Sequence, residues 1–333
     1  MSPRARRLGA LSAAAVVCLA LAVVGCAHSP RSAPALRRPA TPDPYVVVLG
    51  TAQDGGLPHA SCTCPRCVAA RRDPRRRRRI AAIAIIVPAT GRRFLVDATP
   101  DLREQLDLLP EAGTHTTGKV DRAPVDGVLL THAHVGHYLG LAFFGFEAVH
   151  SSRLPVHATP RMAAFLQVNA PWSRLVARDE IELKEMPPGV TFDLDDGVRV
   201  TPFAVPHRDE DSDTVGFKIE GRRHTIAYVP DTDTWATWDP EAIQALAECD
   251  TALIDGTFFG SDELPGRAVS QIGHPLMVTT MDRLEGDVRS GRLRVLFSHL
   301  NHSNNALDPE GPERRAISTR GFAVAEDGQR LPL

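Results

Sequence analysis

The sequence predicts one α/β domain that spans residues 45–333 and consists of two similar halves. Short apolar runs alternate with segments of helical spacing in both halves, and no change in composition separates the halves. This alternation predicts sheets covered by helices. Hydrophobic residues make up 43% of the 333 residues and aromatic residues only 5%, so we expect a core of mainly aliphatic side chains.

The elements are expected in the following order. In the first half, apolar β-branched runs predict strands at 45–49, 80–87, 94–96 and 125–130, and helical spacing predicts a helix at 102–109. In the second half we expect strands at 198–205, 215–219, 224–229, 252–254 and 295–297, and helices at 241–247 and 276–288. Residues 50–58 are rich in turn-forming residues.

The first 44 residues have a different composition. A basic start is followed by an apolar stretch at 8–24, which is typical of a signal peptide covering residues 1–25. Val23-Val24-Gly25-Cys26 resembles a bacterial lipobox, in which the cysteine is lipidated, and the alternative is an uncleaved membrane anchor. Residues 26–44 are predicted to be a flexible tether. We therefore expect an exported, membrane-anchored lipoprotein at the periplasmic face or cell surface.

The charge of the chain gives no reason to expect nucleic-acid binding. The net charge of −2 becomes −5 when residues 1–25, with three arginines and no acid, are removed. An arginine run extends from Arg75 to Arg79, after Arg71 and Arg72. This run is predicted to be a solvated loop, with an anion-binding rim beside the active site as the alternative.

Cysteines cluster in one segment. Cys62, Cys64 and Cys67 form Cys-x-Cys-x-x-Cys, and an odd number of cysteines in an exported chain favours metal thiolates over a disulfide framework. The alternative is a redox-active or disulfide-bonded set. Cys249 stands alone before an apolar strand and is predicted to be a buried thiol.

The main chemical signal is the segment Thr131-His132-Ala133-His134-Val135-Gly136-His137. In an extended segment, residues two apart project to the same side, so His132 and His134 can bind one metal ion. A helix beginning near Tyr138 can direct His137 to the same place. Imidazole is a common ligand of zinc, iron and manganese.

Further polar groups follow apolar strands, where a sheet presents side chains to a cleft. In chain order they are His207, Asp231, Asp255, His299 and His302. A single histidine is more often a hydrogen-bonded structural residue than a ligand, but the ordered set predicts one cluster. His274 is interpreted as a substrate contact or as a group that orients the ligands.

These motifs resemble the metallo-β-lactamase fold superfamily, whose pattern is His-x-His-x-Asp-His followed by a distant His, an Asp and a final His. The opening Leu49-Gly50-Thr51-Ala52-Gln53-Asp54-Gly55-Gly56, the cysteine motif, Asp255-Gly256-Thr257-Phe258 and His299-Leu300-Asn301 resemble the pyrroloquinoline quinone biosynthesis protein B family. The cysteine motif and the His-x-x-His ending also resemble the phosphonate-pathway cyclic phosphodiesterase family. The resemblance implies an αββα sandwich of two mixed sheets with helices on the outer faces.

The resemblance also implies a set of ligands. His132, His134 and His207 would hold a first metal ion, and His137 and His299 a second, with Asp231 bridging the two. Cys62, Cys64, Cys67 and His302 would hold a structural zinc ion. Gly136 stands where the superfamily has aspartate. We therefore expect a weakened or absent second metal position, or a replacement carboxylate such as Asp101 or Asp255.

The function implied is that of a metal-dependent enzyme with one or two divalent ions (Zn, Mn or Fe) at the active site. Asp231 and His299 would be catalytic, and metal-activated water or oxygen would act on a small-molecule or peptide-derived substrate. The enzyme would be a phosphodiesterase-like hydrolase or an oxidative enzyme of the protein B type. The alternative is a binding or carrier lipoprotein without turnover, which Gly136 supports.

Overall fold

Two mixed seven-stranded sheets form the centre of the structure, a computed structural model that describes residues 42–109, 123–263 and 273–333. The first sheet has the order β14 (Arg330–Pro332), β1 (Tyr45–Gly50), β2 (Ala82–Val87), β3 (Arg92–Val96), β4 (Gly127–Leu129), β5 (Leu154–Ala158) and β6 (Ile181–Glu185). The second has the order β7 (Phe192–Asp195), β8 (Val198–Ala204), β9 (Val215–Glu220), β10 (Thr225–Val229), β11 (Thr251–Asp255), β12 (Arg294–Ser298) and β13 (Ala323–Val324).

The two sheets repeat one pattern of strand pairing. In each order given above, the first three pairings are antiparallel and the last three are parallel. The C-terminal strand β14 completes the first sheet beside β1, so both chain halves contribute to it. The predicted α/β fold with two similar halves is therefore confirmed.

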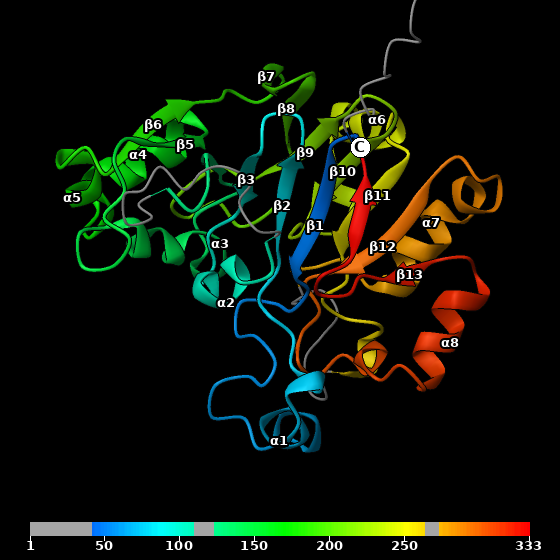
Figure 1. Cartoon of the computed structure of the whole chain (residues 1–333). Coiled ribbons are helices and arrows are strands. Elements are labelled where there is room, and N and C mark those ends of the chain that lie inside the picture. Colours follow the sequence, from blue (N-terminus) through cyan, green and yellow to red (C-terminus); the bar gives the residue numbers. More distant parts are fainter. Residues whose placement is uncertain (1–41, 110–122, 264–272) are drawn as a thin grey trace, which may run out of the picture. The chain divides into compact units, whose positions relative to one another are not determined.

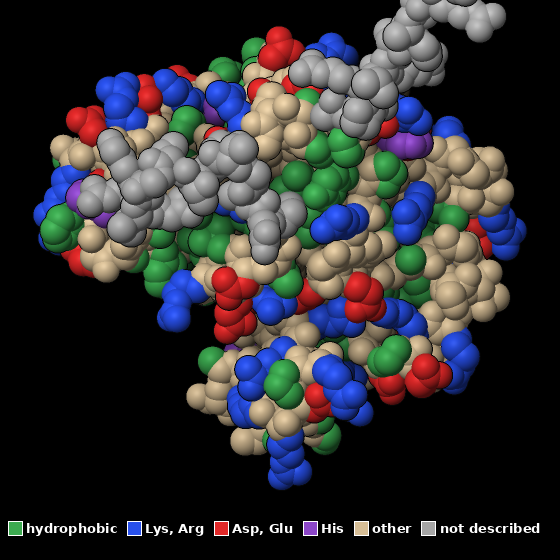
Figure 2. All heavy atoms as spheres, in the orientation of Figure 1, with side chains coloured by type: hydrophobic (Ala, Val, Ile, Leu, Met, Phe, Trp, Pro, Cys, Tyr) green, Lys and Arg blue, Asp and Glu red, His purple; other side chains and the backbone are tan. Residues whose placement is uncertain are grey.

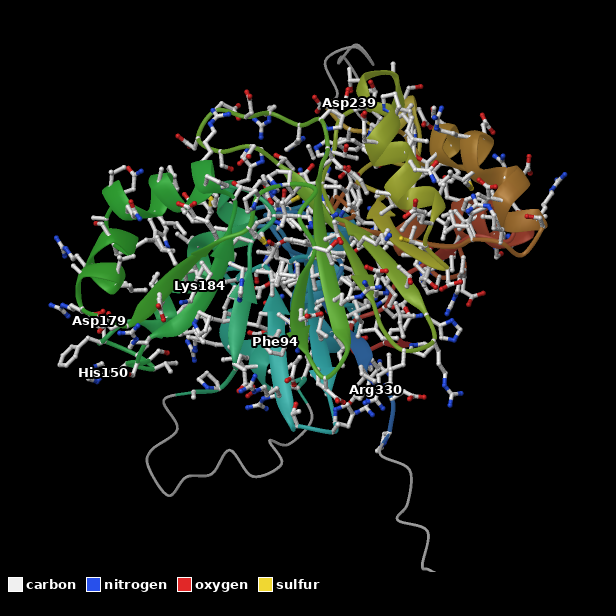
Figure 3. All side chains as sticks on the ribbon, turned by 90° about the horizontal axis from the view of Figure 1, so that it is seen from above. Phe94, His150, Asp179, Lys184, Asp239 and Arg330 are labelled. Carbon is white, nitrogen blue, oxygen red and sulfur yellow. The ribbon has the colours of Figure 1, made fainter. Side chains whose placement is uncertain are left out.

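Apolar side chains fill three layers. The layer between the sheets contains residues of both, among them Phe94, Phe217 and Tyr228. A second layer joins the first sheet to α2 (Leu102–Leu106), α4 (Pro160–Val168) and α5 (Trp172–Ala177). A third joins the second sheet to α6 (Pro240–Ala247), α7 (Met277–Arg289) and α8 (Pro312–Thr319). Figure 1 shows these helix groups on the two outer sides, and Figure 3 shows Phe94 between the facing sheets.

Short elements position the loops. They are α1 (Pro65–Arg72), α3 (Val135–Tyr138) and the 3₁₀ turns η1 (Pro74–Arg76), η2 (Leu139–Phe144), η3 (Trp235–Thr237), η4 (Ser261–Glu263) and η6 (Asn305–Leu307). The helix expected to begin near Tyr138 begins at Val135, so His137 lies inside α3. On the face shown in Figure 2, basic and acidic side chains are interspersed, with several basic ones over the lobe that contains α1.

The signal peptide, the lipobox and most of the tether fall on residues 1–41, outside the described ranges. Across the described ranges, every helix is too short or too polar to cross a membrane. Cys249 is buried, as the sequence predicts, and its Sγ lies 3.3 Å from the carbonyl oxygen of Ala245.

Candidate metal centre

Three histidines and one aspartate converge at strand ends. His134 Nδ1 lies 2.9 Å from His132 Nε2 and 3.1 Å from His207 Nε2. Asp231 Oδ2 lies 3.1 Å from His207 Nε2 and 3.5 Å from His132 Nε2. Nitrogen and oxygen ligands of a tetrahedral zinc ion, bound at about 2.0–2.1 Å, are separated by about 3.4 Å. The four atoms therefore have the spacing of ligands around a metal ion.

The sheets account for this convergence. His132 and His134 follow β4, while His207 follows β8 and Asp231 follows β10. Both β8 and β10 pair antiparallel with β9, so they run in the same direction and end at the same edge. Groups from distant parts of the sequence meet there, as they do at the carboxyl ends of strands in other α/β sheets.

A second group of ligand types lies beside the first. Asp54 Oδ1 is 3.5 Å from His137 Nε2 and 3.7 Å from His299 Nε2. Asp231 Oδ2 is 4.0 Å and 3.8 Å from the same two nitrogens, so this oxygen faces both groups. Asp54 Oδ1, His137 Nε2 and His299 Nε2 are buried and have no hydrogen-bond partner among the described residues.

The carboxylate facing this second group comes from Asp54, which the sequence did not identify as a ligand. Of the two expected replacements for the missing aspartate, Asp101 lies outside the candidate ligand groups of the described residues, whereas Asp255 lies in a neighbouring group with Asp231, His274 and His299. Asp101 Oδ2 accepts from the backbone N–H of Ile80, 2.9 Å away. Asp255 accepts from the backbone N–H groups of Thr257 and Thr232 and contacts His274. The sequence signal that could have identified this ligand is an acidic residue, Asp54, followed by two glycines in the opening motif.

Each histidine of the two groups has a partner on its other ring nitrogen. The nitrogen–oxygen pairs are His132 with Thr131 (3.0 Å), His137 with Asp97 (2.7 Å), His299 with Thr257 (3.0 Å), His207 with Asp233 (3.3 Å) and His134 with Glu210 (3.4 Å). Partners of this kind fix the tautomer and orientation of metal-binding imidazoles. The sequence did not reveal these partners, because hydroxyl and carboxyl groups beside a histidine motif are common.

Charges in the centre suit a cation. Burial acts to raise the pKa of Asp231, but the surrounding imidazoles hold that pKa well below its ordinary value. Burial lowers the pKa of His132, so its imidazole is neutral and its nitrogen can act as a ligand. Burial also acts to lower the pKa of His137, but Asp97 and Asp54 raise it well above its ordinary value. A metal ion at His137 Nε2 would therefore displace a proton.

His274 contacts carboxylates at the edge of the centre. Its Nδ1 lies 2.8 Å from Asp255 Oδ2 and 3.2 Å from Asp231 Oδ1. Burial acts to lower the pKa of His274, but Asp255 and Asp231 raise it to about 11. A protonated imidazole donates to both carboxylates, so His274 orients Asp231. The ligand atoms of Asp231, Asp255, His274 and His299 also lie close enough together to surround one metal ion.

The cysteine motif forms a separate cluster with His302. The Sγ atoms of Cys62, Cys64 and Cys67 lie 3.6, 4.0 and 3.7 Å from His302 Nδ1. With zinc bonds of about 2.3 Å to sulfur and 2.0–2.1 Å to nitrogen, tetrahedral geometry separates the two ligands by about 3.6 Å. All four cysteines in the described residues are free thiols, which disagrees with the disulfide alternative. The four ligand atoms fit the predicted zinc site.

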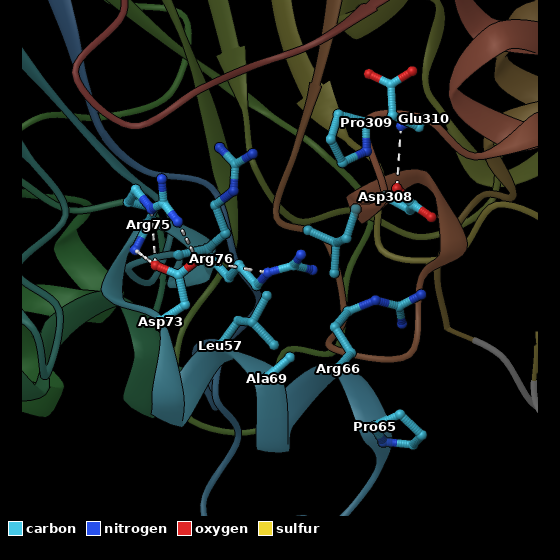
Figure 4. A pocket seen from close by; sticks show the side chains of 12 residues that line it. Leu57, Pro65, Arg66, Ala69, Asp73, Arg75, Arg76, Asp308, Pro309 and Glu310 are labelled. Carbon is cyan, nitrogen blue, oxygen red and sulfur yellow. Dashed lines mark hydrogen bonds and ion pairs between the residues drawn. The ribbon is translucent and has the colours of Figure 1, made fainter.

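The arginine run has local partners. Arg75 pairs with Asp73 at 3.0 Å, Arg78 with Glu326, and Arg79 with Asp327 at 3.5 Å. A cavity of about 690 Å³ lies between α1 and the segment after η6, with residues 308–310 on its far side (Figure 4). Arg75 is largely exposed, whereas Arg78 is largely buried against Glu326. The solvated-loop and anion-rim interpretations of the run both stay predictions.

Comparison with known families agrees with this architecture. The model of the β-lactamase superfamily domain matches residues 92–300 of the chain. The chain therefore belongs to the β-lactamase superfamily, in agreement with the expected metallo-β-lactamase fold.

Within that superfamily the chain is similar to coenzyme PQQ synthesis protein B. It is 30% identical over 310 residues to the protein of Methylorubrum populi, an alignment that covers 87% of this chain and 100% of the relative. The crystal structure of Zn(2+)-bound PqqB from Methylobacterium extorquens aligns with a TM-score of 0.72 and 28% identity, covering 87% of this chain and 100% of that one. A diphosphatase of the PhnP family, with a TM-score of 0.60, 19% identity and coverage of 88% and 98%, shares the fold.

Proposed function

We propose that the chain is a metal-dependent enzyme of the coenzyme PQQ synthesis protein B type, which hydrolyses a small-molecule or peptide-derived substrate. The observation that carries the proposal is the position of Asp231 Oδ2, within 4.0 Å of ligand nitrogens on five histidines. Buried, unpaired polar atoms cost free energy unless they bind something, and these residues offer the donor set of a divalent metal site.

The residues of the centre divide the work. His132, His134 and His207 would hold one divalent ion together with Asp231. The same carboxylate also faces His137 and His299, so it could contribute to a position beside them. A divalent ion bound there would lower the pKa of a water molecule and polarise a substrate oxygen. Asp231 stays ionised at neutral pH because the imidazoles depress its pKa. His274 and Asp255 hold Asp231 in place, and the partners on the outer ring nitrogens hold the histidines.

An oxidative activity is the second candidate, because the motifs resemble the protein B family and that resemblance implies it; the chain is similar to a member of this family over 87% of its length. Iron would use the same imidazoles as zinc, with oxygen rather than water as co-substrate. The carrier hypothesis is weakened, because it relied on a missing carboxylate and Asp54 supplies one.

The test uses purified chain that is stripped with a chelator and reloaded separately with Zn²⁺, Mn²⁺ or Fe²⁺. Bis-nitrophenyl phosphate and a β-lactam panel report hydrolysis, and oxygen uptake reports oxidation. We expect metal-dependent hydrolysis that is lost in His207→Ala and kept in His224→Ala, a matched change at a half-exposed histidine. If the iron-loaded chain consumed oxygen and no metal form hydrolysed either substrate class, the oxidative activity would replace the hydrolytic one. Metal binding without either activity would support the carrier hypothesis.

A further inference from the structure

The geometry points to Asp54 as the carboxylate ligand of a second metal position, in place of the aspartate that Gly136 lacks. The inference rests on the proposed function in one respect: a first ion bound by His132, His134 and His207. It assigns to the opening loop a role that the histidine motif fills elsewhere in the superfamily, and it predicts a centre with two ions.

The first argument is the set of unpaired atoms. Asp54 Oδ1 and the Nε2 atoms of His137 and His299 face one another at 3.5 and 3.7 Å, which is too long for good hydrogen bonds. His137 Nδ1 contacts Asp97, which leaves Nε2 as the ring atom that faces Asp54 and His299. Three atoms of the types that bind divalent ions therefore surround one position in which none of them has a hydrogen-bond partner among the described residues.

The second argument is the space at Gly136. A Cβ atom placed on Gly136 would lie 2.1 Å from Asp54 Oδ1 and 2.8 Å from its Cγ. The Asp54 carboxylate thus occupies the volume into which an aspartate at position 136 would extend. The two positions exclude each other, so the centre holds one carboxylate there, supplied by either of them.

The third argument is that the loop is fixed to the site. The N–H of Gln53 donates to the carbonyl of Leu300 at 3.0 Å, and the N–H of Leu300 donates to the carbonyl of Thr51 at 2.8 Å. Leu300 directly follows His299, so backbone pairing places Asp54 beside that histidine. Gly56 has a φ of +66°, which glycine adopts at low cost, and it turns the chain sharply after Asp54.

The competing explanation is structural: Asp54 could be only an ion-pair partner of protonated His137. Removal of Asp54 would then change stability but not the number of bound ions. Metal content per folded chain therefore separates the two explanations without any measurement of activity.

The experiment measures metal per chain by mass spectrometry after equilibration with excess Mn²⁺, together with the spin-coupled paramagnetic resonance of a Mn²⁺ pair. We expect two ions at the histidine centre of the wild type and one in Asp54→Ala, with loss of the coupled signal. Gly136→Asp should not raise the count, because its Cβ would meet both the carboxylate and the Cα of Asp54. Asp101→Asn is the matched control and should keep both.

Equal loading of the wild type and Asp54→Ala would overturn the inference, and so would a Gly136→Asp variant that binds more ions than the wild type. Asp54→Asn, of the same size, provides the same comparison if the alanine variant does not fold, and it should also lose one ion. A wild type that binds no ion at the histidines would overturn the proposed function itself, while one ion that is unaffected by Asp54 would overturn only this inference.

Discussion

Asp97 controls the orientation of His137, and replacing it with asparagine should weaken metal binding at the second group. Asp97 is fully buried, and its Oδ2 lies 2.7 Å from His137 Nδ1. Its Oδ1 accepts from the backbone N–H of Thr131 at 2.9 Å. Asparagine has one oxygen, which can serve Thr131, but its amide NH₂ then faces His137. To accept from that amide, His137 must move its proton to Nε2, the atom directed at the metal position.

Loss of such an outer partner typically costs about 10–100-fold in metal affinity, or about 1.4–2.8 kcal/mol. We therefore expect Asp97→Asn to weaken the second ion by that factor and to leave the first ion nearly unchanged. A competition titration with a chromophoric chelator measures both affinities. Asp101→Asn is the control, because its carboxylate accepts only from the backbone of Ile80 among its described hydrogen bonds. Affinities for both ions within about twofold of the wild type would refute the tautomer argument.

Four other outcomes are expected. His132→Ala should lose the first ion with an unchanged circular dichroism spectrum, because His132 lies after β4 and not in a strand; wild-type metal content would contradict the assignment. Cys67→Ser should lower zinc by one ion per chain and lower the melting temperature, and equal zinc would exclude the cysteine site. Cys26→Ser should abolish labelling by radioactive palmitate, and equal labelling would exclude lipidation. Burial, with a smaller contribution from Lys184, lowers the pKa of His157 from 6.5 to about 4. The unfolded chain therefore takes up a proton at this histidine at higher pH than the folded chain does. The contribution of His157 to the free energy of unfolding is complete above pH 6.5 and declines as the pH falls towards 4. In urea unfolding, the free energy of unfolding of His157→Gln should fall less between pH 6.5 and pH 4 than that of the wild type. Identical pH profiles of the two proteins would contradict this.

The strands of the two sheets that flank the centre could be predicted, because they are continuous apolar runs buried on both faces. β2 and β10 illustrate this: the first is entirely buried, and the second is buried at four of its five positions. The elements between 154 and 195 were not predicted. β5 alternates buried and partly buried residues and contains Pro155, and α4 begins at Pro160, so local signals there favoured loops. Helix α1 was missed because its sequence is polar, and Cys64 caps it through its side chain.

The histidine ligands could be predicted because they follow strands whose ends lie at one edge of the sheet. The carboxylate of Asp54, which faces His137 Nε2, could not be predicted. Residues that follow strands running in the same direction lie at one edge of a sheet, so His207, Asp231 and His299 were expected to meet. Asp54 lies four residues beyond β1, in a turn whose path depends on backbone pairing with Leu300, a contact across 247 residues of sequence. Gly136 showed in the sequence that a side chain was missing, but only the fold shows which chain segment fills the space. For chains of this superfamily, a glycine in the histidine motif is therefore weak evidence for a lost ligand until the opening loop has been placed.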